Sequence, residues 1–210
     1  MDLKLTGKVA LVTGSTAGIG FAIAKSLAEE GAHVYVNGRT QARVDAATTS
    51  IRSHTGSDRV DGIVADFANA AGAETVIANL PEVDVLVNNV GIFEPRPFVD
   101  IPDADWYRFF EINVMSGIRL SRHYLFGMLR KNWGRILFIS SESAVQIPAE
   151  MVHYGMTKTA QVAIARGIAE STAGTGVTVN SIPTRTNRVR RCGRLCRSHG
   201  KATEQVAGDR

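Results

Sequence analysis

Residues 8–20 constrain the fold more than any other part of this sequence. They read KVALVTGSTAGIG, and the next residues read FAIAKSLAEEGA. This order predicts a strand, a tight glycine turn and a helix. Glycines let main-chain N–H groups approach a pyrophosphate closely, and the helix N-terminus behind them favours its negative charge. The spacing is G-x-x-x-G-x-G, and such a loop also occurs as a turn without a ligand.

Length and composition favour one cytoplasmic domain. The chain has 210 residues, of which 44% are hydrophobic, enough for a single substantial core. No apolar run resembles a signal peptide or reaches the length of a membrane span. The two cysteines, Cys192 and Cys196, lie near the C-terminus, so the first 191 residues cannot carry a disulfide framework. We therefore expect a cytoplasmic protein with no membrane partner.

Strands and helices are expected to alternate after the glycine turn. Apolar or β-branched runs predict five further strands, at 33–37, 59–66, 84–87, 135–140 and 177–182. Further helices are expected at about 41–54, 68–80, 102–131 and 151–172. The alternation predicts an α/β fold: a Rossmann-like, doubly wound parallel sheet of six strands, covered by helices on both faces.

Polar side chains gather where the predicted strands end. The residues that share this position are Asp66, Asn88, Asn89, Ser140 and Ser141. Parallel strands end at one edge of the sheet, which is where such sheets bind ligands. Tyr154 and Lys158 lie four residues apart in a predicted helix and hence on one face of it. This spacing allows the two side chains to act together.

The combined motifs resemble the short-chain dehydrogenase/reductase family over about residues 5–182. They are T-G-x-x-x-G-I-G at the turn, N-N-x-G after the fourth strand, Asn113 in a long helix, and Ser141 thirteen residues before Y-x-x-x-K. The resemblance, which extends to 3-oxoacyl thioester (acyl-carrier-protein) reductases, implies reduction of a small carbonyl compound to an alcohol by hydride transfer. It also implies a homo-dimer or homo-tetramer formed through the two long helices.

The resemblance assigns four catalytic residues. Tyr154 would be the general acid, with a phenol pKa well below its ordinary value of about 10. Lys158 would supply positive charge that favours the phenolate and would hold the nicotinamide ribose. Ser141 would hydrogen-bond the substrate carbonyl oxygen. Asn113 would anchor a water that leads to the lysine.

The same resemblance implies a set of nucleotide-binding residues. The glycine turn would cradle the pyrophosphate, Asp66 would meet the adenine, and residues 89–91 would line the adenosine side. The residues assigned to the cofactor are Gly14, Ser15, Gly18, Ile19, Gly20, Arg39, Asp66, Asn89, Gly91, Tyr154 and Lys158. No metal site is expected, because Cys192, Cys196 and His199 lack a fourth ligand.

The end of the second strand favours NADP over NAD. An acidic residue there would bind the 2′-hydroxyl of NAD, but the sequence reads Asn37-Gly38-Arg39. Arg39 could pair with the 2′-phosphate of NADP. Against this, Ala17 stands where NADP-preferring relatives often place a second basic residue, and Arg39 could simply be solvated. NAD therefore stays possible.

Two aromatic features are better explained by packing than by ligand binding. His153 adjoins Tyr154, but neighbouring helical residues point about 100° apart, which favours a partly buried structural histidine. The helical set Trp106, Tyr107, Phe109 and Phe110 is more typical of core or subunit contact.

The sequence departs from the family pattern after residue 183. Family members continue with a Pro-Gly turn, a closing segment and a last strand, whereas this chain continues with Thr184 and Arg185. Residues 184–210 hold eight Lys or Arg and two Asp or Glu, which leaves residues 1–183 with a formal charge of −2. We expect a catalytic domain over 1–183 and a basic, disordered tail over 184–210.

Three origins of this tail stay open: a frameshift or truncation, a basic arm for nucleic acid or an acidic partner, or a helix completed by another subunit. The main body gives no reason to expect nucleic-acid binding. The alternative to a reductase is a truncated remnant that binds nucleotide, has weak or no activity, and serves as an interaction protein.

Overall fold

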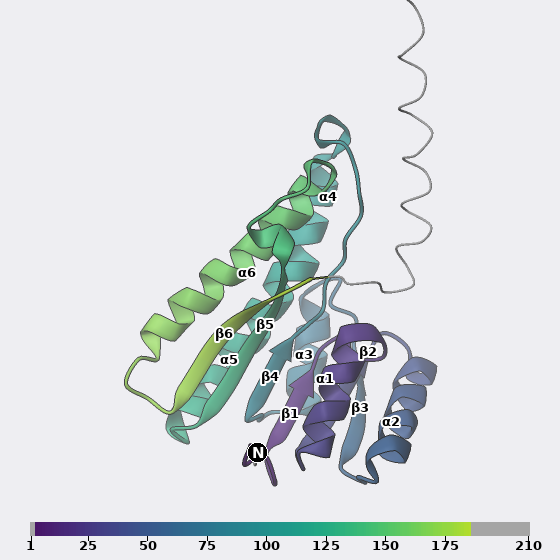
Figure 1. The fold of residues 1–210 in the computed structure, drawn as a ribbon, viewed down its shortest axis with the longest axis vertical. Helices are drawn as coiled ribbons and strands as arrows, with labels where there is room; N and C mark the ends of the chain where they lie inside the picture. The colour runs from purple at the N-terminus through teal and green to yellow at the C-terminus, as the bar shows by residue number, and fades with distance from the viewer. Residues whose placement is uncertain (1–2, 186–210) are drawn as a thin grey trace, which may run out of the picture.

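The computed structural model describes residues 3–185, which form a parallel sheet flanked by helices (Figure 1). The strands are β1 (Val9–Val12), β2 (His33–Gly38), β3 (Val60–Val64), β4 (Val85–Asn88), β5 (Gly134–Ser141) and β6 (Val177–Thr184). The helices are α1 (Gly18–Glu29), α2 (Gln41–Thr55), α3 (Ala70–Asn79), α4 (Asp103–Phe110), α5 (Ser116–Arg130) and α6 (Val152–Ser171). Short 3₁₀ turns occur at Phe98–Asp100, Glu142–Ala144 and Ala149–Met151.

The strand order is β3-β2-β1-β4-β5-β6, and every neighbouring pair is parallel. Strand β1 is central: Val12 pairs with Val36 of β2 on one side and with Val87 of β4 on the other. The loops that follow β1 and β4 therefore leave the sheet edge at the point where the strand order reverses, the usual ligand position in such sheets. The predicted Rossmann-like, six-stranded parallel fold is confirmed.

Two apolar cores cover the two faces of the sheet. Successive strand residues point to opposite faces, so Leu11 lies in a core with α3, α5 and α6, whereas Ala10 and Val12 face α1 and α2. Helices were expected over both faces of the whole sheet. On the α1 side, Thr178 and Asn180 of β6 are exposed, because no described helix lies over them.

The boundaries of three predicted elements need correction. The helix expected over 102–131 is α4 and α5 joined by a π-helical segment, Glu111–Met115. Strand β3 ends at Val64, so Asp66 follows the strand by two residues instead of ending it. Strand β6 continues to Thr184, past the boundary proposed at residue 183.

The predictions for the tail, including disorder and the three candidate ligands at 192, 196 and 199, concern residues 186–210, outside the described range. Within residues 3–185, no helix has both the length and the apolar character needed to cross a membrane.

Candidate active site

The glycine turn between β1 and α1 has the backbone shape of an anion cradle. Gly14 and Gly18 both have φ of +60°, a conformation that favours glycine. The first turn of α1 carries neither a side-chain cap nor an acidic residue, so its N–H groups and positive dipole end are not neutralised there. At Gly20 a Cβ would lie 2.4 Å from Nδ2 of Asn89 and 2.6 Å from the carbonyl oxygen of Gly14. The helix therefore packs directly on the turn, and the cradle fits a dinucleotide pyrophosphate.

Two side-chain amides hold the turn from opposite sides. Asn37 at the end of β2 accepts the Gly14 N–H (3.0 Å) and donates to the carbonyls of Ile63 and Ala65. Asn89 after β4 donates to the carbonyls of Thr13 (2.9 Å) and Gly14 (3.0 Å). Sequence reasoning noted only that Asn37 is not a carboxylate. The signal that it missed is a polar residue inside a buried strand, which has to be hydrogen-bonded.

The remaining predicted cofactor residues lie around this edge in different environments. Ser15 is fully buried, and its hydroxyl donates to the Val12 carbonyl and accepts the Asn37 N–H. Its side chain thus braces the turn from within. Ile19, Arg39 and Asp66 are exposed.

The predicted catalytic residues Ser141, Tyr154 and Lys158 come together across β5 and α6. Ser141 is the last residue of β5 and hydrogen-bonds the Tyr154 side chain. One turn further along α6, Nζ of Lys158 lies 5.6 Å from the centroid of the Tyr154 ring and donates to the Ile139 carbonyl (2.8 Å). Gly91 lies alongside, since a Cβ there would be 3.4 Å from Nζ of Lys158.

Burial moves the pKa values of Tyr154 and Lys158 away from their ordinary values. Burial raises the pKa of the Tyr154 phenol above 10, while its hydrogen bond with Ser141 acts in the opposite direction. Burial lowers the pKa of Lys158 to about 8. The protein groups alone therefore do not produce the lowered tyrosine pKa expected from the sequence, because removing the phenolate from water outweighs the hydrogen bond. Tyr154 consequently holds its proton at neutral pH, as a proton donor must.

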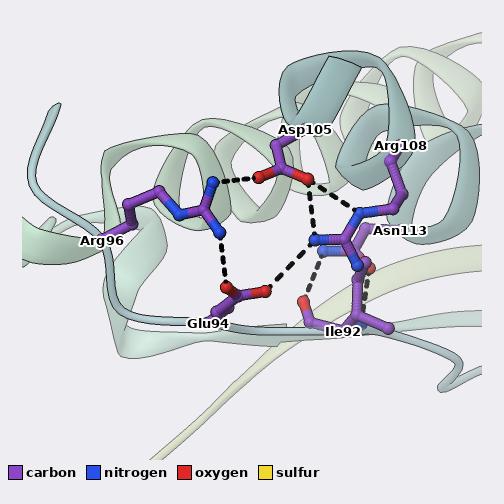
Figure 2. Close-up of polar contacts among 6 residues, drawn as sticks. All are labelled: Ile92, Glu94, Arg96, Asp105, Arg108 and Asn113. Carbon is purple, nitrogen blue, oxygen red and sulfur yellow. Dashed lines mark hydrogen bonds and ion pairs between the residues drawn. The ribbon is translucent and has the colours of Figure 1, made fainter. Parts of the chain in front are cut away.

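Asn113 lies in the π-helical segment and clamps two elements together. Its side chain accepts the Ile92 N–H (2.7 Å), donates to the Ile92 carbonyl (2.9 Å), and donates to Oγ1 of Thr157 on α6 (3.0 Å). Figure 2 shows the paired bonds to Ile92. Its main-chain carbonyl accepts a hydrogen bond from Gln161 (2.6 Å), a residue that sequence reasoning did not select.

A ring of four charged side chains fixes the loop that follows Ile92 onto α4 (Figure 2). Glu94 and Asp105 each contact both Arg96 and Arg108, at 2.7–3.2 Å. Hydrogen bonds from Arg96 and, to a smaller extent, from Arg108 lower the pKa of Glu94. Phe93 in the same loop lies edge-on to Tyr154, with ring centroids 6.2 Å apart. The four charged side chains therefore hold the loop that places the apolar side chain of Phe93 beside the candidate proton donor Tyr154.

His153 does not extend this polar site. It is 1% exposed and packs against Phe109 and Trp106, with ring centroids 4.0 and 6.0 Å away. Burial lowers its pKa, which favours the neutral ring. The structure thus gives it a packing role, with deeper burial than expected. Of the aromatic set on α4, Phe109 is core whereas Tyr107 is exposed.

Comparison with known proteins identifies the family. Residues 8–188 match the family described as short chain dehydrogenase. The chain is 50% identical over 182 residues to the uncharacterised oxidoreductase YvaG of Bacillus subtilis, a match that covers 87% of this chain and 69% of that protein. It is 39% identical to the D-beta-hydroxybutyrate dehydrogenase of Cupriavidus necator, with 85% and 70% covered.

A solved relative shares this fold. The L-sorbose reductase of Gluconobacter frateurii, complexed with NADPH and L-sorbose, superposes with a TM-score of 0.85 at 30% identity, covering 95% of this chain and 79% of that one. The chain belongs to the short-chain dehydrogenase/reductase family of oxidoreductases.

Proposed function

We propose that this protein is an NADP-dependent reductase that converts a small carbonyl compound to an alcohol, with Tyr154 as the general acid. The observation that carries the proposal is the meeting of Tyr154 with Ser141 and Lys158 at the sheet edge that also bears the glycine turn. The 3-oxoacyl thioesters suggested by the resemblance and simpler ketones are the substrate classes to compare.

The chain's own groups divide the work of carbonyl reduction. When bound, the reduced nicotinamide supplies the hydride that adds to the carbonyl carbon. The Tyr154 hydroxyl gives its proton to the carbonyl oxygen, while the Ser141 hydroxyl hydrogen-bonds the same oxygen. Lys158, in its charged form, stabilises the phenolate that remains on Tyr154. Phe93, whose ring lies edge-on to that of Tyr154, forms an apolar surface beside the reacting group.

The preference for NADP rests on the charges around the cradle. Arg39 follows β2 directly and is exposed at the carboxyl edge, and the stretch Asn37-Gly38-Arg39 holds no carboxylate that would oppose a phosphate. A guanidinium there can pair with a 2′-phosphate through charge-assisted hydrogen bonds. NAD is the alternative cofactor.

The activity is tested by titrating NADPH fluorescence with the protein and assaying turnover on a panel of ketones and 3-oxoacyl thioesters. Tyr154→Phe should lower kcat by at least about 100-fold, because the general acid is lost, and leave the Kd for NADPH nearly unchanged. Tyr107→Phe is the matched control, since Tyr107 is exposed on α4 and should keep full turnover. Binding of NADPH without turnover of any substrate would instead support the nucleotide-binding interaction protein.

The cofactor preference is tested by reversing the charge at Arg39. Arg39→Asp should weaken NADPH binding and shift the ratio of kcat/KM values toward NADH. Arg59→Asp makes the same change just before β3, at the opposite edge of the sheet, and should leave the ratio unchanged. Equal use of both cofactors before and after Arg39→Asp would remove Arg39 from this role.

Self-association through α5 and α6 stays a prediction. Phe126 on α5 is 65% exposed, which is compatible with a covered face in an oligomer. Size-exclusion chromatography with light scattering measures the state directly.

A further inference from the structure

Gln161 forms a buried bridge between the candidate active-site lysine and the π-helical segment. It lies three residues after Lys158 on α6 and is 1% exposed. Its Oε1 accepts a hydrogen bond from Nζ of Lys158 (3.1 Å), and its Nε2 donates to the main-chain carbonyl of Asn113 (2.6 Å). One side chain thus connects two elements whose residues are 48 positions apart in the sequence.

The chemistry of the three groups fixes the direction of this bridge. An ammonium can only donate hydrogen bonds and a carbonyl oxygen can only accept them, whereas a primary amide does both. The oxygen end of the Gln161 amide must therefore face Lys158, and its nitrogen end must face Asn113. A leucine or methionine of similar size would leave the buried carbonyl without this donor and the ammonium without this acceptor.

The bridge leaves Lys158 with a defined orientation. Two of its three N–H donors bind the Ile139 carbonyl of β5 and the Gln161 amide, so the third is free to serve Tyr154 or a ligand. Of the groups that the structure places against its Nζ, the Tyr154 ring is the titratable one, whereas β5 presents a main-chain carbonyl and α6 the neutral Gln161 amide. Neutral dipoles, and no carboxylate among these contacts, therefore stabilise the buried cation.

We propose that Gln161 is a positioning residue, which holds the Lys158 ammonium beside Tyr154 by connecting it directly to the Asn113 carbonyl. The resemblance assigns Asn113 to a water that leads to the lysine, and in this chain the Gln161 side chain binds the Asn113 main-chain carbonyl. The Gln161 link therefore orients Lys158 and supports its charge.

The catalytic meaning of this bridge rests on the proposed function, whereas the bridge itself can be measured without turnover. The pKa of Lys158 can be followed by ¹³C NMR of the Cε resonance in protein labelled with ¹³C-lysine, because the chain has only six lysines to assign. Lys158→Met identifies the signal. The same samples then provide the pH profile of kcat.

Two substitutions should move the Lys158 pKa in opposite directions. Gln161→Met removes the acceptor dipole, so the pKa should fall by about half a unit or more below its value of about 8. Gln161→Glu places a carboxylate against the ammonium, so the pKa should rise by about one unit or more. The pH above which kcat falls should likewise be lower for Gln161→Met and higher for Gln161→Glu.

The control separates positioning from packing. Tyr124→Phe removes another buried side-chain hydrogen bond, from the Tyr124 hydroxyl to the Leu80 carbonyl (2.7 Å). It should lower Tm without moving the Lys158 resonance titration. If both Gln161 variants keep the wild-type pKa and merely lose Tm as this control does, Gln161 is a packing residue and the proposal is wrong.

The NMR titration also keeps the two proposals apart. If the wild type turns over no carbonyl substrate but the Lys158 pKa still shifts as expected, the proposed function fails and the bridge stands. If one Gln161 variant does not fold, the other alone tests the proposal, because the Lys158 pKa is expected to move in a stated direction in each.

Discussion

The two halves of the sheet bury different kinds of polar groups. Around the glycine turn, the half that contains β1, β2 and β3 uses neutral side chains such as Ser15 and Asn37, bound to main-chain atoms. The half that contains β4, β5 and β6 buries a cation, Lys158, against a carbonyl and an amide. Neutral groups can be buried at little net cost once they are hydrogen-bonded, whereas a buried charge shifts its pKa. The half with β1, β2 and β3 thus holds the backbone shape of the glycine turn, and the half with β4, β5 and β6 determines the protonation state of Lys158.

The largest effect on this contrast is expected from Gly20→Ala in the nucleotide half. The added methyl group would overlap Asn89 and the Gly14 carbonyl, which should destabilise the fold by about 1–3 kcal/mol. A displaced cradle should also weaken NADPH binding by about tenfold or more, since tenfold corresponds to about 1.4 kcal/mol. Thermal unfolding and NADPH titration measure the two losses.

Gly167→Ala on α6 is its matched control. A Cβ at Gly167 meets nothing within 4 Å, so the substitution should stabilise the helix by about 0.5–1 kcal/mol. If both alanines behave alike, close packing at Gly20 does not shape the cradle.

The pH dependence of reduction should follow the titration of Lys158. The pKa of Lys158 is lowered to about 8, so its charge is present below that pH and is lost as the pH rises through it. The kcat for reduction should therefore fall above about pH 8, by up to about tenfold per unit. Lys131→Met should not change the pH at which kcat falls, because Lys131 is paired at the surface with Glu82.

The same shift has a consequence for stability. The unfolded chain keeps the Lys158 proton up to its ordinary pKa of 10.5, whereas the folded chain releases it near 8. Between these values the unfolded state binds more protons, so the contribution of this group to the unfolding free energy rises with pH. Lys158→Met should remove this rise, and denaturant titrations at pH 7.5 and 10 would detect it. If Lys158→Met keeps the wild-type difference in unfolding free energy between pH 7.5 and pH 10, Lys158 is not the source of the rise.

The smallest effect is expected in the charged ring over the site. Glu94→Gln removes a carboxylate that is 44% exposed, and pairs of this kind contribute about 0–1 kcal/mol to stability. Asp105→Asn should cost more, because the Asp105 side chain is 15% exposed and contacts the same two arginines. Chemical denaturation of both variants tests the order, and a larger loss for Glu94→Gln would contradict it.

Local patterns were sufficient for the sheet and for most of the candidate site. Alternating and continuous apolar runs predicted all six strands, and Tyr154 and Lys158 could be placed on one helix face from their spacing alone. The errors occur at element ends and inside the long helix. The π-helical segment Glu111–Met115 contains Asn113, whose contacts with Ile92 and Thr157 join parts of the chain that no local pattern relates.

The sequence by itself determined the order of strands and helices and which polar residues follow which strand, because backbone periodicity and glycine turns act over a few neighbouring residues. Only the tertiary structure decided what those residues do. Asn37 reaches a turn 23 positions earlier, and Gln161 reaches a carbonyl 48 positions earlier. Their partners, their burial and the pKa of Lys158 depend on segments brought together by packing, and that information lies in the folded chain.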